Sequence, residues 1–336
     1  MKILITGGAG YIGSHTIIEL IKQGFNEVVS IDNFLNSSEV TYSRIEQITG
    51  IRIKQYSIDL KDLDALDNVF AIEQFQGVIH FAALKSVPES VASPTLYYQN
   101  NLVSLTNVLE MMKKYKVNKL IYSSSCSVYG NVNSLPVTEE TDLKKAESPY
   151  ALTKQIGESL IENFCSLNHA FKAISLRYFN PAGAHTSGLT GEVKTHRPSN
   201  LVPLIALQAA GKLKQLEVFG DDYSTKDGSC IRDYIHVSDI ANAHVNALLK
   251  IENLNSNYHV YNLGSGTGMT TLEVIAAFEE SNKVRINFTI GPRRAGDVEA
   301  IFASNSMAKK DLDWEIKHDI KSICTTAWKW QLSSSN

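Results

Sequence analysis

"ITGGAGYIGSH" (residues 5–15) joins the end of an apolar run to three glycines in the spacing GxxGxxG, Gly7, Gly10 and Gly13. The run "KILIT" (2–6) predicts a buried strand, and the residues near 12–23 predict a helix. Glycines permit a tight turn, and the first N–H groups of a helix are free to bind a pyrophosphate. The stretch therefore predicts a phosphate-binding turn between a strand and a helix, although a turn used only for packing would contain the same glycines.

The residues at the ends of the next strands decide between these two interpretations. Asp32 ends the second predicted strand, nineteen residues beyond Gly13. A carboxylate at this place accepts from a ribose 2′-hydroxyl and repels a 2′-phosphate, which favours NAD over NADP. Asp59, after the third strand, can accept from an adenine amine. Small residues that let a cofactor approach the backbone follow the fourth strand, in the segment Phe81, Ala82 and Ala83.

Short apolar runs alternate with helical patterns through the first half of the chain. Strands are predicted at 2–6, 27–32, 51–57, 77–82, 119–125 and 172–179, and helices near 12–23, 62–74, 95–115 and 150–168. Strands separated by helices indicate a parallel sheet covered on both faces, the doubly wound α/β architecture.

A change in composition after Phe179, where Gly, Pro and Asn become frequent, predicts a domain boundary. The first domain is expected over 1–180 and a smaller α/β domain over 181–336, with a segment near 235–250 returning to the first. Strands of the smaller domain are predicted near 216–219, 258–263 and 285–290, and helices near 201–213, 238–250 and 271–281.

The composition is that of an ordinary globular protein, with 43% hydrophobic and 20% charged residues in 336. A net charge of −3 gives no basic field for nucleic acid or an anionic membrane. The four cysteines are far apart and show no metal-binding spacing, so a metal is not expected. No signal peptide and no run of about 18 apolar residues is seen. We therefore expect a cytoplasmic protein.

"SPYALTKQIGESL" (148–160) places Tyr150 and Lys154 four residues apart on a predicted helix. This spacing brings two side chains together on one helix face, as in many surface pairs. The same spacing at Tyr115 and Lys119 spans a predicted helix end and a strand, so the spacing alone is not specific.

The fifth predicted strand ends in "SSSCSVYG" (123–130), at the sheet edge where a nicotinamide would lie. A free Tyr has a pKa of about 10, which is too high for a base at neutral pH. A lysine ammonium and a positive nicotinamide ring would both lower it. Ser125, Tyr150 and Lys154 are therefore candidates for moving a proton while a hydride moves.

The motifs "TGGAGYIG", "SSS…VYG", "YALTK" and "RYFNPAGAH" resemble those of the extended short-chain dehydrogenase/reductase superfamily. "DNFLNSS", "HFAALKSVPESV", "GSCIRDYIHVSDIA" and "YNLGSGTG" are similar to segments of its UDP-glucose (UDP-galactose) 4-epimerases, and the resemblance runs from Met1 to about Trp330. It implies reversible epimerisation at C4 of UDP-glucose and UDP-galactose, through a transient 4-keto sugar and bound NADH. It also implies a homodimer formed through the helices near 95–115 and 150–168.

Carried over residue by residue, the resemblance implies three groups of site residues. The catalytic residues would be Ser125, Tyr150 and Lys154. These three would also contact NAD, together with Gly7, Gly10, Tyr11, Ile12, Gly13, Asp32, Asn33, Phe34, Leu35, Asn36, Ser37, Asp59, Leu60, Phe81, Ala82, Ala83, Leu84, Lys85, Asn100 and Phe179. The UDP-sugar would contact Lys85, Ser125, Tyr150, Asn180, Asn200, Leu201, Phe219, Arg232, Tyr234, Arg294, Asp297 and Ile301.

Ile301 is of special interest because the resemblance implies that it stands beside the 2-substituent of the sugar. Relatives confined to plain hexoses tend to carry Tyr at this place, and those that accept N-acetylhexosamines carry a small residue. Ile is intermediate in size and stiff. We expect slow turnover of UDP-N-acetylglucosamine, unless Ile301 is ordinary strand packing.

Three other functions remain open. A nucleotide-sugar 4,6-dehydratase usually has an Asp-Glu pair after the strand-end hydroxyl residue, whereas Cys126 and Ser127 follow Ser125 here. An epimerase of UDP-hexuronates or UDP-N-acetylhexosamines is excluded less firmly. A non-catalytic NAD-sensing regulator would have no need of Tyr150 and Lys154.

Overall fold

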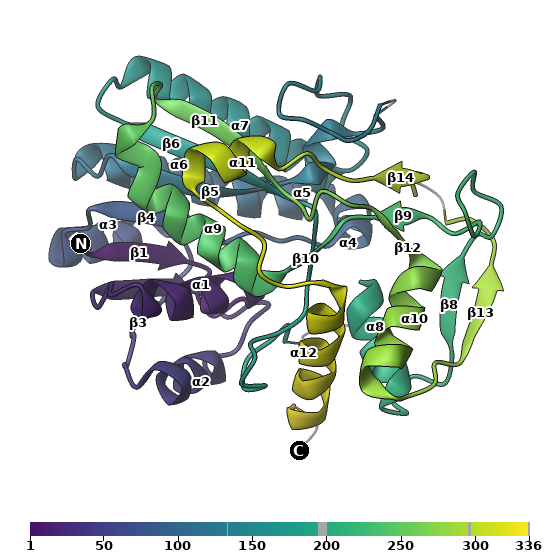
Figure 1. Ribbon diagram of the computed structural model, residues 1–336. Helices are drawn as coiled ribbons and strands as arrows, with labels where there is room; N and C mark the ends of the chain where they lie inside the picture. Colours follow the sequence, from purple (N-terminus) through teal and green to yellow (C-terminus); the bar gives the residue numbers. More distant parts are fainter. Residues whose placement is uncertain (133, 194–199, 295–296, 335–336) are drawn as a thin grey trace.

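A seven-stranded parallel sheet forms the centre of the protein, in a computed structural model that describes residues 1–132, 134–193, 200–294 and 297–334. The strand order is β11-β6-β5-β4-β1-β2-β3 (Figure 1). The strands are β1 (Ile3–Thr6), β2 (Val28–Asp32), β3 (Lys54–Ser57), β4 (Gly77–His80), β5 (Lys119–Ser125), β6 (Lys172–Tyr178) and β11 (Tyr258–Leu263).

Helices cover both faces of this sheet because its strands are apolar on both sides. In β1, Ile3 and Ile5 pack on one face and Leu4 on the other. The first face is covered by α1 (Tyr11–Lys22), α2 (Val40–Thr49), α9 (Val237–Lys250) and α11 (Ser306–Leu312). The second is covered by α3 (Leu63–Glu73), α6 (Val103–Lys114) and α7 (Pro149–Leu167). The predicted doubly wound α/β fold is confirmed.

The structure differs from the predicted elements in two places within the first half. The helix predicted near 95–115 is α5 (Pro94–Tyr97), a π-helical turn η1 (Tyr98–Leu102) and α6, preceded by α4 (Val87–Ala92). Helix α2 was not predicted, because it is mostly polar and buries only Thr41, Tyr42 and Ile45. A helix with so narrow an apolar face gives little periodic signal.

Strand β11 belongs to the main sheet, so the prediction that put 258–263 in the smaller domain is wrong. It pairs with β6 in parallel along its whole length, from Tyr258 opposite Ala173 to Leu263 opposite Tyr178. Figure 1 shows it in green beside the teal β6. The sequence pattern of a strand does not indicate which sheet the strand joins, because the edge of either sheet offers the same backbone N–H and carbonyl groups.

The remaining elements form the smaller part of the molecule, on the right of Figure 1. Its strands are β7 (Asn180–Ala182), β8 (Leu216–Phe219), β9 (Ile231–Arg232), β10 (Tyr234–His236), β12 (Met269–Thr270), β13 (Phe288–Gly291) and β14 (Ala300–Ile301). Its helices are α8 (Leu201–Ala209), α10 (Thr271–Asn282) and α12 (Ile320–Ser333). The short 3₁₀ turns η2 (Cys126–Tyr129) and η3 (Ile251–Asn253) follow β5 and α9 of the larger part. Side chains such as Ile205, Phe278 and Ile323 form a separate apolar core.

The described residues lack two features that would bear on function. No helix among them has the length and apolar character needed to cross a membrane. They also contain no group of three or more His, Cys, Asp or Glu side chains placed to hold a metal ion.

Candidate active site

The turn between β1 and α1 is so closely packed that it admits only glycine at two positions. Gly7 has a φ of +71°, and a Cβ there would lie 2.8 Å from the Ala82 nitrogen. A Cβ on Gly13 would lie 2.3 Å from the Gly7 carbonyl oxygen. Gly10 is the N-cap of α1 and supplies no side-chain cap. The first N–H groups of α1 thus lie at a glycine-rich turn, where they are available to a pyrophosphate.

Gly8 is also closely packed in this turn, against side chains rather than backbone, although the predicted site did not include it. A Cβ on Gly8 would lie 2.1 Å from the Ser30 hydroxyl oxygen of β2. The signal in the sequence is the doublet of glycines after β1. Its cause is the contact with the neighbouring strand, which spacing alone does not reveal.

Asp32 fixes the loop after β2 against the glycine turn. Its Oδ2 accepts from the Ala9 N–H at 3.0 Å, and its Oδ1 accepts from the Phe34 N–H at 2.9 Å and the Ser37 hydroxyl at 2.8 Å. The residue is only 8% exposed. A carboxylate has about four acceptor positions, so three donors leave room for a ribose hydroxyl.

The residues predicted to line the NAD after β2 and β3 differ in their environment. Asn33 and Asp59 meet, with 3.4 Å between the amide nitrogen and a carboxylate oxygen, at the ends of β2 and β3. Leu35 and Asn36 are exposed in the loop beside them. Leu60 is buried in the core under the second face of the sheet, so its side chain packs there.

The segment after β4 is held by a residue that the predicted site did not include. Asn101 accepts from the Leu84 N–H at 2.8 Å and donates to the Leu84 carbonyl at 3.0 Å. The Leu84 side chain is 3% exposed, which leaves its backbone as the part nearest the predicted ligand. Asn100, in the π-helical turn, donates to Asn101 at 3.1 Å. The Phe81 ring lies 4.6 Å from that of His244.

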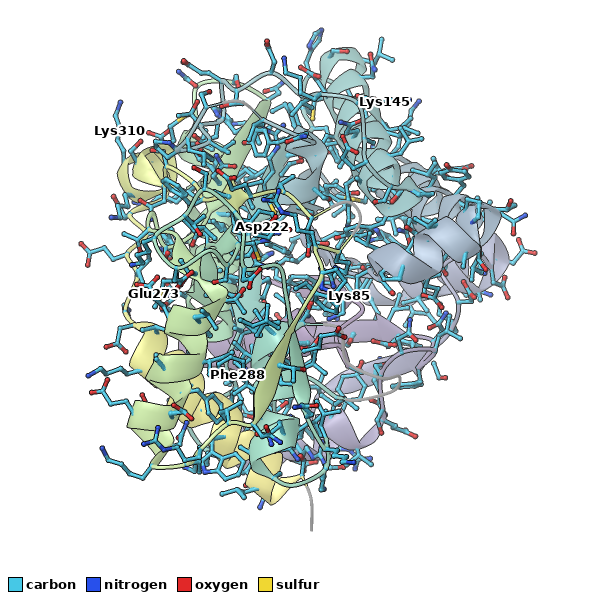
Figure 2. All side chains as sticks on the ribbon, turned by 90° about the vertical axis from the view of Figure 1, so that its right-hand side faces the viewer. Lys85, Lys145, Asp222, Glu273, Phe288 and Lys310 are labelled. Carbon is cyan, nitrogen blue, oxygen red and sulfur yellow. The ribbon has the colours of Figure 1, made fainter. Side chains whose placement is uncertain are left out.

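Lys85 and Tyr11 lie where the larger and smaller parts of the molecule meet. Lys85 pairs with Glu192 at 2.6 Å, and its ammonium lies 5.7 Å from the centre of the Tyr11 ring. The Tyr11 hydroxyl donates to the Gly183 carbonyl at 2.6 Å. In Figure 2, Lys85 appears between the purple and blue N-terminal half and the green C-terminal segments. Glu192 comes from a segment without regular structure, and no motif pointed to it.

The three candidate catalytic residues come together at the carboxyl end of β5. Helix α7 begins at Pro149, and its N-cap Ser148 accepts from the Ala151 N–H at 3.1 Å, which places Tyr150 in the first turn. Ser125 is the last residue of β5, and it lies close enough to the Tyr150 side chain to affect its pKa. Lys154, one turn further along α7, donates to the Ser123 carbonyl at 2.6 Å.

The protein side chains alone do not lower the pKa of Tyr150, which corrects the sequence-based expectation. Burial raises the pKa of Tyr150 to about 12, and the hydrogen bond with Ser125 opposes this only in part. Burial also lowers the pKa of Lys154 to about 7, so its ammonium form is incomplete at neutral pH. Desolvation disfavours both charged forms and here exceeds the effect of the lysine.

Two arginines in the smaller part converge on one carboxylate. Asp297 accepts from Arg294 at 2.8 Å and from Arg232 at 3.4 Å, and Arg232 also donates to the Val298 carbonyl at 2.8 Å. Arg294 lies over the Phe219 ring, 5.4 Å from its centre. Tyr234 and Arg232 lie in neighbouring short strands. Residues 295 and 296 of this segment lie outside the described residues. Guanidinium groups so gathered suit a diphosphate.

The other residues predicted to hold a sugar nucleotide lie at the start of the smaller part. The side-chain oxygen of Asn180 is buried and has no hydrogen-bond partner among the described residues. Asn200 is the N-cap of α8, before Leu201, and its side chain makes no capping bond. Ile301, 7% exposed, packs in one cluster with Phe179 and Cys126, the residue after Ser125.

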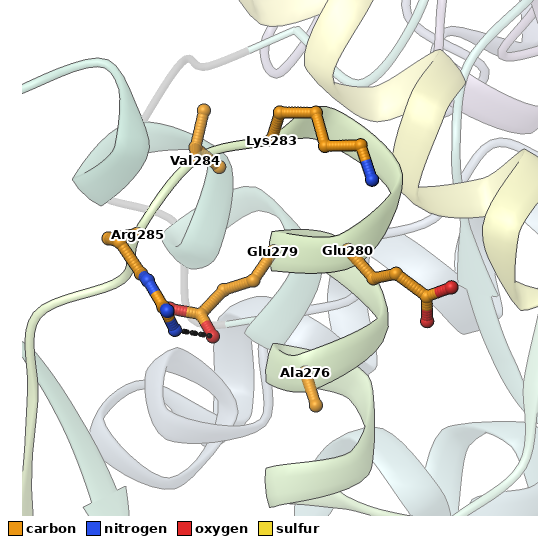
Figure 3. Close-up of a pocket in the computed structure, with 6 residues that line it drawn as sticks. All are labelled: Ala276, Glu279, Glu280, Lys283, Val284 and Arg285. Carbon is orange, nitrogen blue, oxygen red and sulfur yellow. Dashed lines mark ion pairs between the residues drawn. The ribbon is translucent and has the colours of Figure 1, made fainter.

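A surface pocket far along the chain from these motifs is not part of the site. Its lining comes from the end of α10 and the residues after it, Ala276, Glu279, Glu280, Lys283, Val284 and Arg285. Figure 3 shows Glu279 and Arg285 facing each other across it, with 3.5 Å between their charged groups. None of the candidate residues lines it.

Comparison with known proteins agrees with this geometry. The NAD dependent epimerase/dehydratase family matches residues 3–264. The chain is 46% identical over 336 residues to the UDP-glucose 4-epimerase of Bacillus subtilis (strain 168), covering 100% of this chain and 98% of that protein.

Two crystal structures of UDP-glucose 4-epimerases are similar over the whole chain. One, from Stenotrophomonas maltophila with bound NAD and formylated UDP-arabinopyranose, has a TM-score of 0.97 and 43% identity. The other, from Bifidobacterium longum in complex with NAD+ and UDP, has a TM-score of 0.95 and 44% identity. Each comparison covers 100% of this chain and 99% of the other. The chain therefore belongs to the NAD-dependent epimerase/dehydratase family and, within it, to the group of the UDP-glucose 4-epimerases.

Proposed function

We propose that this protein interconverts UDP-glucose and UDP-galactose by inverting C4 of the hexose, with NAD as its cofactor. The observation that carries the proposal is that Ser125, Tyr150 and Lys154 lie together at the carboxyl end of β5, where Lys154 donates to the Ser123 carbonyl at 2.6 Å, at the same edge of the sheet as the glycine turn. A 4,6-dehydratase would need an acid and a base after Ser125. The residues there are Cys126 and Ser127.

The chain fits NAD through the closely packed turn at Gly7 and Gly13 and the preset carboxylate of Asp32. When bound, NAD+ accepts a hydride from C4 and returns it, so no net oxidation occurs. The positive nicotinamide ring would also favour the phenolate form of Tyr150. The protein side chains alone do not supply the charge needed for this.

Tyr150 and Ser125 handle the proton of the sugar 4-hydroxyl. The Tyr150 oxygen takes this proton as C4 is oxidised and returns it when C4 is reduced, and the Ser125 hydroxyl orients the same oxygen. Lys154 acts on Tyr150 through its charge. A general base in such a place contributes about 10²–10⁴-fold to the rate.

Inversion requires that the 4-keto sugar turn over while its nucleotide stays bound. Arg232 and Arg294 hold the diphosphate, the N-terminus of α8 adds neutral donors, and the unpartnered side-chain oxygen of Asn180 adds an acceptor. Strong contacts to UDP and few to the hexose permit rotation about the diphosphate linkage.

Incubation of the purified protein with UDP-galactose and no added cofactor tests the proposal. We expect UDP-glucose as the product, and NAD, identified by its mass, among the molecules released on denaturation. NADP in its place would contradict the role of Asp32. Absence of UDP-glucose even after addition of NAD would contradict the activity.

Ile301 sets how far the enzyme accepts a bulky 2-substituent. Because Ile301 packs with Phe179 and Cys126 beside Ser125, its size limits the space at the sugar. UDP-N-acetylglucosamine is expected to turn over less well than UDP-glucose, since a partial clash costs about 1–3 kcal/mol. Ile301→Tyr should further lower the kcat/KM for UDP-N-acetylglucosamine relative to the kcat/KM for UDP-glucose. Ile290→Tyr, on the exposed face of β13, is the matched control. An unchanged ratio in the Ile301 variant would leave strand packing as its only role.

We also propose which part of the chain binds each ligand, that the protein is a homodimer and that it is cytoplasmic. Residues 1–180 hold NAD and the catalytic groups, and residues 181–336 mainly hold the UDP-sugar. A homodimer through the helices over 95–115 and 150–168 is supported by Leu96 of α5 and Val103 of α6, which are apolar and each 40% exposed. Four free cysteines are consistent with a cytoplasmic enzyme. Sedimentation analysis, compared with a Val103→Glu variant, and cell fractionation test these points.

A further inference from the structure

Two consecutive serines of β5 are each bound by one residue of α7. Lys154 donates to the Ser123 carbonyl at 2.6 Å, and Glu158 accepts from the Ser124 hydroxyl at 2.5 Å. Lys154 and Glu158 are four residues apart, so they lie on the same face of the helix. They are 3% and 5% exposed. The helix that carries Tyr150 is thus held at two points to the strand that ends in Ser125.

Glu158 is itself fixed from the next strand. Arg177 donates to both of its carboxylate oxygens, at 2.9 and 2.6 Å. Arg177 of β6 lies opposite Ser124 of β5 in the sheet register, so both partners of Glu158 come from paired positions. Arg177 also donates to the Tyr129 hydroxyl at 2.9 Å, which donates to Asn262 of β11 at 2.6 Å. A bidentate contact of this kind has little freedom to move.

The charges around Lys154 give Glu158 a second effect. From β5, the Tyr122 ring faces the ammonium with 4.8 Å to its centre, and His80 of β4 stacks on Tyr122. Burial lowers the pKa of His80 to about 3, so it is neutral. Tyr150 is neutral as long as its pKa is high. The positive charge of Arg177 disfavours the ammonium form of Lys154, and the negative charge of Glu158 favours it.

We propose that Glu158 is a positioning residue, which fixes Ser125 against Tyr150 through Ser124 and keeps Lys154 protonated during turnover. The inference rests on the proposed epimerase activity, because it assigns a role within that reaction. It does not depend on Glu158 touching the substrate. In agreement with it, burial lowers the pKa of Lys154 and Glu158 opposes the shift.

The pH dependence of kcat in Glu158→Gln tests the charge effect. Activity needs the ammonium form of Lys154, so it falls as the pH rises through the pKa of Lys154. Removal of the Glu158 charge makes the ammonium less favourable and lowers that pKa. The alkaline limb should therefore move to lower pH, by about one unit, as expected for loss of a close opposite charge.

The matched control is Glu73→Gln, in a second buried carboxylate that bonds Lys2, Lys54 and Tyr56. Glu73 is 3% exposed and lies at the end of α3, so its loss should lower stability and leave the alkaline limb in place. The midpoint of Lys154 can be followed directly by NMR of ¹³Cε-labelled lysine, assigned with Lys154→Met. It should be lower in Glu158→Gln than in the wild type.

The variant Ser124→Ala tests the positioning effect and keeps the pair of Glu158 and Arg177. We expect kcat to fall about 10- to 100-fold with KM unchanged, as for a small misplacement of catalytic groups, and the alkaline limb to stay. If Glu158→Gln folds and neither its limb nor its Lys154 midpoint moves, the proposal is wrong. If it does not fold, a wild-type kcat in Ser124→Ala overturns the proposal. A wild type that is inactive on UDP-galactose would contradict the epimerase activity itself, whereas the NMR midpoints would still be measurable.

Discussion

Tyr150→Phe is expected to lose about 10²–10⁴-fold in kcat and to keep its NAD. The phenol is the group that meets Ser125 at the end of β5, and Phe keeps the ring and its packing while it removes the oxygen that carries the proton. Because the hydroxyl has no part in the glycine turn, the amount of NAD that copurifies should match that of the wild type. Initial rates with UDP-galactose and NAD released on denaturation measure both.

Tyr115→Phe is the control for this substitution. Tyr115 also precedes a lysine by four residues, but it follows the last turn of α6, whereas Lys119 begins β5. Its hydroxyl bonds Asp67 at 2.8 Å, at the surface of the protein. Loss of that bond should leave kcat unchanged. Near-normal activity of Tyr150→Phe would remove Tyr150 from the mechanism.

Gly13→Ala is expected to bind NAD about 10- to 100-fold more weakly, since overpacking of this kind typically costs about 1–3 kcal/mol. The added Cβ would lie 2.3 Å from the Gly7 carbonyl oxygen and 2.9 Å from the Gly8 Cα. Both are backbone atoms, so relief requires the turn itself to open. The opened turn would then no longer hold the first N–H groups of α1 in place for a pyrophosphate. Isothermal titration calorimetry of the NAD-free protein with NAD measures the affinity.

Gly211→Ala separates this effect from backbone strain. Gly211 also has a left-handed φ, +71°, yet no atom lies within 4 Å of a Cβ built there. Its variant should lose some stability and bind NAD as the wild type does. Stoichiometric NAD in Gly13→Ala, at wild-type affinity, would show that the turn does not need this glycine.

Local patterns were enough to predict strands β1 to β6 of the main sheet. Strands β2 and β5 each contain a recognisable apolar stretch, and they end in Asp32 and Ser125. The burial of the site could not be predicted in this way. Spacing put Lys154 beside Tyr150, but only the packing shows that desolvation acts on both and that Lys154 donates to a carbonyl.

Residues that act from a distance in sequence were missed for the same reason. Glu158 belongs to the quoted helix, yet its partner Arg177 comes from another strand, and Glu192 meets Lys85 from beyond β7. Helix α2 is too polar to give a periodic signal. These contacts are products of the topology, which a single sequence does not display.

The edge strand β11 has a consequence for how the chain is made. The sheet that binds NAD obtains this strand only after the smaller part of the protein has been inserted between β6 and β11. During synthesis, the edge of β6 that pairs with β11 therefore stays unpaired until residue 263 has left the ribosome. An exposed strand edge is a template for aggregation. A fragment that ends near residue 180 would keep that edge permanently, so we expect it not to fold independently.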